Sequence, residues 1–91
     1  MELIWETPSE MAMDLAKRMK AIRRRKKLTQ VQLAARSNVS YGALKKFEQT
    51  GEISLVSLIK IAMELNVSDE IKELFTKPVY SSIDEVLRDG N

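Results

Sequence analysis

The chain of 91 residues contains no cysteine and no histidine. The absence of cysteine excludes disulfides and thiolate metal sites and is typical of a reducing cytosol, so we expect a cytoplasmic protein. The absence of histidine removes both the commonest general base and the commonest metal ligand. The sequence also lacks a glycine-rich phosphate loop and a spaced set of carboxylates. It therefore predicts no catalytic, metal or cofactor site, and no enzyme.

Long hydrophobic runs are missing as well. The apolar segments are short and interrupted by charge, and residues 1–6 lack the basic start and apolar centre of a signal peptide, so neither a membrane span nor a leader is expected. Glycine occurs three times and proline twice, and no Gly/Ser linker divides the chain, which indicates one small domain. No segment alternates between apolar and polar residues for long, so we predict an all-α fold.

The charges are unevenly distributed although the net charge is only +2. Residues 1–47 hold eleven Lys/Arg against four Asp/Glu, whereas residues 48–91 hold four against nine. Eight of the eleven residues from 17 to 27 are basic. Such a cluster alone is either a solvated helix face or a phosphate-binding surface, and the motif described below favours phosphate contact.

Capping signals and apolar spacing predict five helices and a short sixth one. The capping box that Thr7 and Glu10 form opens the first helix, in which apolar residues follow at helical spacing (Met11, Leu15, Met19 and Ile22). Thr29 is predicted to cap the second helix, and serines are predicted to cap the third, fourth and fifth helices (Ser40, Ser54 and Ser68). The fourth helix should bury Leu55, Leu58, Ile59, Ile61, Ala62 and Leu65. The expected helices cover residues 8–26, 30–37, 41–49, 55–66, 69–75 and 83–88. We therefore expect an arm (1–7), a helical domain (8–76) and a tail with a short helix (77–91).

Residues 28–48 are the most informative segment, because they predict two short helices joined by a tight turn. Five apolar positions would hold the helices at a fixed angle (Leu33, Ala34, Val39, Leu44 and Phe47). Asn38 stands where the chain must leave the first of them, and asparagine is the best substitute for glycine in the left-handed conformation. The second helix begins with small and polar residues. This pattern is typical of a helix-turn-helix, whose second helix enters the DNA major groove.

The pair Thr29-Gln30, the spacing to Ser40 and the pair Phe47-Glu48 resemble the phage-repressor-like (Cro/lambda-repressor, XRE) helix-turn-helix family over roughly residues 15–75. The resemblance implies a compact five-helix lambda-repressor-like domain that binds double-stranded DNA. The flanking segments 7–10 and 78–87 are similar to a bacterial subgroup in which the protein accompanies a HipA-type kinase toxin as its antitoxin. Two positions depart from the family pattern, since Asn38 replaces the usual glycine and Ser37 replaces a larger apolar residue.

The resemblance also implies which residues meet DNA. The first residues of the third helix would face base edges, with two lysines a turn further on (Ser40, Tyr41, Gly42, Lys45 and Lys46). Gln30 would contact a phosphate, and because helix N-termini favour anions, Thr29 and Gln30 are expected to form a phosphate clamp. From the basic cluster we expect Arg23, Arg24 and Lys26 to touch the adjacent DNA backbone. Glu48, an acidic residue among basic ones, is expected to pair with an arginine of the first helix.

Two questions stay open at the level of sequence. Gly42 costs about 1 kcal/mol in a helix relative to alanine, and it is either a tolerated surface glycine or a point where the backbone approaches the groove floor. The second question is what the apolar residues of the arm, fifth helix and tail contact. They either pack on the domain's own core or form a dimer surface (Leu3, Ile4, Trp5, Ile71, Leu74, Phe75, Val79, Tyr80, Ile83, Val86 and Leu87).

The function that these observations favour is a dimeric, sequence-specific repressor, because one helix reads only about three or four base pairs and such domains pair up on half-sites one helical turn apart. The alternative is an antitoxin whose acidic second half neutralises a kinase toxin and whose DNA binding serves autoregulation.

Overall fold

The computed structural model describes residues 6–78, and helices fill most of this part of the chain. The five helices are α1 (Pro8–Arg25), α2 (Gln30–Ser37), α3 (Tyr41–Thr50), α4 (Leu55–Glu64) and α5 (Ser68–Lys72). No strand occurs between residues 6 and 78, so the predicted all-α fold is confirmed. The predicted helix over 83–88 and most of the predicted arm lie outside the described residues, and the division of the chain at residues 7 and 76 stays a prediction.

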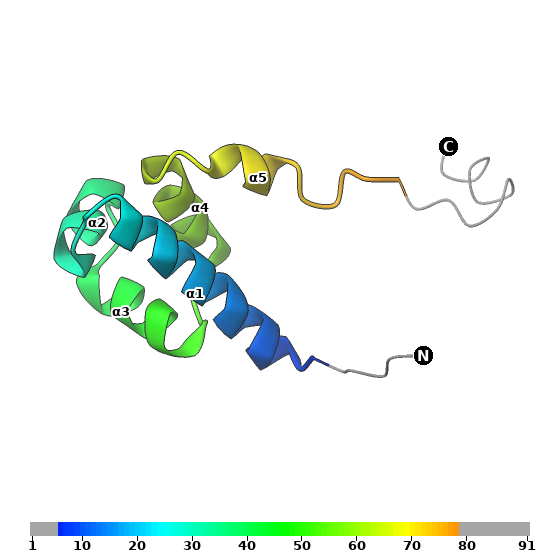
Figure 1. Ribbon diagram of the computed structural model, residues 1–91, viewed down its shortest axis with the longest axis horizontal. Coiled ribbons are helices and arrows are strands. Elements are labelled where there is room, and N and C mark those ends of the chain that lie inside the picture. The colour runs from blue at the N-terminus through cyan, green and yellow to red at the C-terminus, as the bar shows by residue number, and fades with distance from the viewer. Residues whose placement is uncertain (1–5, 79–91) are drawn as a thin grey trace, which may run out of the picture.

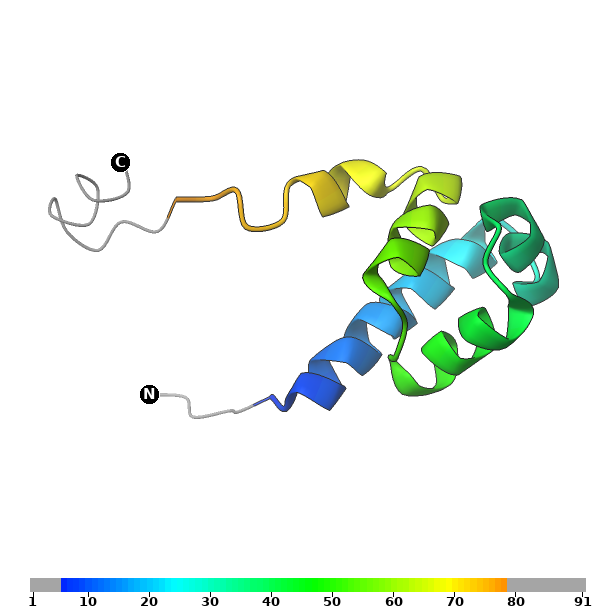
Figure 2. The same ribbon diagram turned by 180° about the vertical axis from the view of Figure 1, so that it is seen from behind.

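The long helix α1 runs diagonally along the bundle, with α3 on one side and α4 and α5 on the other (Figure 1). Helix α2 lies at the C-terminal end of α1 and packs against both α3 and α4. Seen from behind, α2 and α3 again form one end of the molecule, while α5 leads away from it (Figure 2). The helix-turn-helix pair is therefore presented at one end of the domain.

Four helices begin at the side-chain caps that the sequence predicts. The hydroxyls of Thr7, Thr29, Ser40 and Ser54 each accept a hydrogen bond from a backbone N–H three residues further on. Thr7 and Thr29 also form complete capping boxes, in which a side chain at the third helical position accepts from the cap's own N–H. The N–H of Thr7 donates to the Glu10 carboxylate at 2.8 Å and, with the Thr7 hydroxyl, lowers the pKa of Glu10 below its usual value.

Three helices end at a non-glycine residue in the left-handed conformation. These residues are Lys27 after α1, Asn38 after α2 and Asn66 after α4, with φ angles of 59°, 58° and 63°. After Asn38 the N–H of Val39 reaches back to the carbonyl of Ala34 at 3.0 Å, which closes the last turn of α2. The left-handed turn predicted for Asn38 is confirmed, and it sets the angle at which α3 follows α2.

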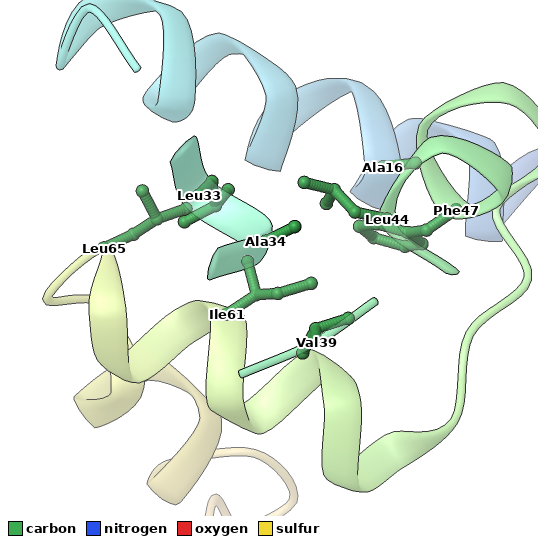
Figure 3. Packing of buried hydrophobic residues seen from close by; sticks show 8 residues of the cluster. All are labelled: Ala16, Leu33, Ala34, Val39, Leu44, Phe47, Ile61 and Leu65. Atoms are coloured by element: carbon green, nitrogen blue, oxygen red, sulfur yellow. The ribbon is translucent and has the colours of Figure 1, made fainter. Parts of the chain in front are cut away.

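The core lies where α1, α2, α3 and α4 meet (Figure 3). Leu33, Leu44, Ile61 and Leu65 are its largest fully buried side chains. All five apolar residues that the helix-turn-helix pattern placed inside are buried, which confirms this part of the prediction. Ser37 is buried too, and its hydroxyl donates to the carbonyl of Leu33 at 2.7 Å. The smaller residue at this position therefore leaves no unpaired polar group.

The apolar spacing correctly predicts the helix α1, but not all of its apolar residues face the core. Met11 and Leu15 are exposed, whereas Ala16 is completely buried. The reason is the close approach of α3, because Gly51 at its C-terminal cap lies against the backbone of α1 at Ala12 and Met13. Only small side chains fit between helices at that distance. Met19 and Ile22, further along α1, do pack against the core.

The predictions for α4 and α5 also need correction. Leu55 is exposed at the start of α4, although Ile61, Ala62 and Leu65 are buried as expected. Helix α5 begins after Val67 without a side-chain cap, so Ser68 does not cap it. Val67 takes that position: its N–H donates to the carbonyl of Ala62 in the turn that ends α4, and its carbonyl accepts the N–H of Glu70. Helix α5 is therefore short, and Phe75, beyond its end, is 98% exposed.

Candidate nucleic-acid interface

Helix α3 has one buried face and one exposed face. Leu44, Phe47 and Glu48 point into the domain, whereas Tyr41, Gly42, Lys45 and Lys46 lie on the surface in two rows of residues four apart. Ser40, which is also exposed, caps the helix through the N–H of Ala43 at 3.1 Å. The structure thus brings the five α3 residues predicted from sequence together on one solvent-facing surface.

A buried ion pair fixes α3 against α1. The Nε and Nη2 atoms of Arg23 donate to the two carboxylate oxygens of Glu48 at 2.8 and 2.9 Å, and Nη1 donates to the carbonyl of Leu28 at 2.7 Å. The side chains of Arg23 and Glu48 are only 9% and 3% exposed. A bidentate ion pair of this kind fixes the relative orientation of the two side chains as well as their distance. The predicted pairing of Glu48 with an arginine of the first helix is confirmed.

Arg23 itself therefore does not fit the phosphate contact expected of it. Three of its N–H groups are already engaged inside the protein, and moving it to the surface would leave Glu48 as an unpaired buried charge. It is a positioning residue for the interface. The cations that remain on the surface at this end of α1 are Arg24, Arg25, Lys26 and Lys27.

Glu48 also holds the side chain of Gln30. The Nε2 atom of Gln30 donates to Oε1 of Glu48 at 2.8 Å, so the first residue of α2 is tied to α3 and, through Arg23, to α1. Thr29, its neighbour, is exposed and caps α2. The predicted clamp residues are thus adjacent at the N-terminus of α2. The Gln30–Glu48 hydrogen bond could not be predicted from local sequence patterns, because the two residues lie 18 positions apart.

Two interactions of the lysines on α3 were also missed. The Nζ atom of Lys45 lies 5.9 Å from the centre of the Tyr41 ring, at the outer limit of a cation–π contact. The Nζ atom of Lys46 lies 3.2 Å from a carboxylate oxygen of Glu52, which follows the end of α3. Helical spacing could have indicated the first contact. The second depends on the turn at Gly51, so helical periodicity could not indicate it.

A helix-turn-helix family model matches residues 19–71, which is more than half of the chain and includes α2 and α3. The chain belongs to the helix-turn-helix family of the Cro/C1 type. The family assignment makes it a DNA-binding transcription regulator. A search of curated proteins found no significant match. Between residues 6 and 78, no helix of this helix-turn-helix protein has the length and apolar character needed to cross a membrane.

Gly42 has no structural reason to be glycine within the described part of the helix-turn-helix protein. A Cβ atom built on it meets nothing within 4 Å, and its φ angle is not positive. Replacing Gly42 by alanine is therefore expected to stabilise the protein by about 1 kcal/mol, which raises the melting temperature by about 4–8 °C for a domain of this size. Thermal unfolding followed by circular dichroism measures the shift.

The same variant separates the two interpretations of Gly42. If DNA approaches the backbone closely at this position, the added methyl group weakens binding while the free protein becomes more stable. A tolerated surface glycine would instead leave the affinity unchanged. A fall in the melting temperature would contradict the open space around Gly42.

Proposed function

We propose that the protein is a dimeric repressor without catalytic activity that inserts α3 into the major groove of double-stranded DNA and thereby blocks a promoter. One observation carries the proposal: Tyr41 and Gly42 at the start of α3 are exposed, while the buried carboxylate of Glu48 fixes the helix to α1 and α2. A rigid helix whose leading end is exposed to solvent suits the reading of base edges.

Some of the exposed residues contact DNA bases, and others contact the DNA backbone. Ser40, Tyr41 and Gly42 lead the helix into the groove and meet base edges. Lys45 and Lys46 contact phosphates or guanine, and because lysine lacks the planar fork of arginine, it reads guanine less selectively. Thr29 and Gln30 bind a phosphate at the N-terminus of α2. With about six phosphates neutralised, the affinity should fall about a thousandfold between 50 and 200 mM salt.

Dimerisation follows from the small number of bases that one helix can read. Two half-sites about one helical turn apart would supply the missing information. Leu74 and Phe75 support an interface beyond α5, because they are 50% and 98% exposed, and a large apolar side chain gains free energy when a partner covers it. The occupied site should therefore hold two chains.

The test begins with a site selected from random double-stranded DNA, measured by fluorescence anisotropy at fixed salt. Reversing two charges in the variant Lys45→Glu/Lys46→Glu is expected to weaken binding by about a hundredfold or more, because favourable phosphate contacts become repulsive. The control Lys60→Glu/Lys72→Glu makes the same charge change at exposed positions of α4 and α5 and should lose much less. Equal losses in both variants would contradict the placement of α3, and a stoichiometry of one chain per site would contradict the dimer.

A second candidate function is neutralisation of a kinase toxin, with DNA binding as autoregulation. The acidic surface of α5 favours it, since Asp69, Glu70 and Glu73 are exposed close to Phe75 in sequence. A kinase gene directly beside this one, whose product copurifies with the chain, would support the antitoxin. An isolated gene whose product binds its site and copurifies with no kinase would support the repressor.

A further inference from the structure

We propose that Glu52 limits the affinity of this interface for DNA of any sequence, because it forms an ion pair with Lys46 in the free protein. The inference rests on the proposed function. It adds that Glu52 determines how much of the DNA affinity comes from contacts to bases rather than to phosphates. Lys46 can meet a phosphate only after it leaves Glu52, and the carboxylate then remains beside the approaching DNA backbone. Both effects oppose binding, and neither depends on base sequence.

The turn between α3 and α4 holds Glu52 in place. The Thr50 hydroxyl donates to the carbonyl of Lys46 at 2.7 Å and accepts the N–H of Glu52 at 3.1 Å, so it links the backbones on both sides of the ion pair. Gly51 makes this possible through its φ of 83°, and its N–H donates to the carbonyl of Phe47 at 2.7 Å. The backbone of Glu52 is thereby fixed relative to the last turn of α3, which keeps the carboxylate within reach of Lys46.

Stability does not explain this ion pair. The side chains of Lys46 and Glu52 are 63% and 70% exposed, and pairs as exposed as this contribute little to folding. The pair lies at the edge of an open hollow between α3 and the start of α4, in the part of the chain that the structure describes. Lys46 is the cation and Glu52 the anion among the residues that line it (Ala43, Lys46, Glu52, Ile53, Ser54 and Ser57). Without Glu52, this edge would present an unopposed positive charge.

The consequence concerns how binding energy is divided. Phosphate contacts are the same on every DNA sequence, so each free cation strengthens binding to the correct and the incorrect site alike. A carboxylate that neutralises one of them lowers this shared contribution, and tight binding then depends more on contacts to base edges. Glu52 thus favours rapid release from DNA that lacks the site.

The test compares the variant Glu52→Gln with the wild type on random-sequence DNA and on the selected site, over a range of salt concentrations. We expect about fivefold tighter binding to both DNAs, and a steeper plot of log affinity against log salt, because no carboxylate then offsets the contact of Lys46 with a phosphate. Glu70→Gln makes the same charge change on the exposed surface of α5 and should alter the affinity less than twofold. In a Lys46→Gln background, Glu52→Gln should lose most of its effect, because the cation that pairs with Glu52 is absent.

Several outcomes would overturn the inference. Binding by Glu52→Gln that is unchanged, weaker or equal to that of Glu70→Gln would remove Glu52 from this role. A changed preference at a single base pair would instead make Glu52 a direct reader of cytosine, whose N4 donates to carboxylates. If the wild type bound no DNA at all, the proposed function itself would fail. If the wild type bound DNA and Glu52→Gln had no effect, only this inference would fail. The two failures are therefore distinguishable.

Discussion

Replacing Glu48 by alanine is expected to lower the free energy of unfolding by about 3–5 kcal/mol, because it leaves the Arg23 guanidinium buried without its counter-charge. The carboxylate also accepts the hydrogen bond from Gln30, so three contacts disappear together. Urea denaturation followed by circular dichroism measures the loss. Glu73→Ala, at an exposed position near the end of α5, should change stability by about 0.5 kcal/mol or less.

The double variant Arg23→Met/Glu48→Leu tests what the ion pair is for. Replacing both charges by apolar side chains of similar volume removes the unpaired charge, so most of the lost stability should return. Gln30 would still lack its partner, and α3 would lack the two-pronged link to α1. Stability close to that of the wild type with weakened DNA binding would identify the network as a positioning device, whereas a single variant Glu48→Ala as stable as the wild type would show that the network contributes nothing.

Gly51→Ala is expected to destabilise the protein by about 2–5 kcal/mol, in contrast to the gain expected at Gly42. Two penalties combine at this position. The left-handed conformation itself costs about 1–2 kcal/mol for a residue with a Cβ atom. In addition, that Cβ atom would lie 2.8 Å from the carbonyl carbon of Ala12 and 2.9 Å from the amide nitrogen of Met13. Because these are backbone atoms, α1 and α3 would have to move apart, at a typical cost of about 1–3 kcal/mol.

A second substitution separates the two penalties at Gly51. Asparagine tolerates the left-handed conformation well but still carries a Cβ atom, so Gly51→Asn should remain clearly destabilised in thermal unfolding. If Gly51→Asn were as stable as the wild type, conformation alone would require glycine, and the close approach of α1 would be irrelevant.

The sequence predicts helix ends and the helix-turn-helix core well because both depend on local chemistry. A hydroxyl that caps a helix acts on an N–H three residues away, as at Thr29 and Ser40, and the left-handed Asn38 acts within a single turn. Apolar spacing also identifies Leu44 and Phe47 as buried, because α3 is short and has one apolar face.

What the sequence could not predict depends on distances between helices. Periodicity shows which residues of α1 share a stripe, but only the contact with Gly51 makes Ala16, and not Leu15, the buried residue. Likewise, Arg23 is one of five consecutive basic residues, and nothing local distinguishes the arginine that faces Glu48. Both predictions required the angle at which α3 crosses α1.

At the end of α1, a favourable surface charge is combined with an unfavourable backbone conformation. Lys27 turns the chain with a φ of 59°, a conformation that glycine adopts freely and that costs a lysine about 1 kcal/mol. Glycine there would ease the turn but would remove one cation from the exposed tip of the basic cluster. The chain tolerates a strained turn between α1 and α2 and retains a positive charge beside the helix-turn-helix.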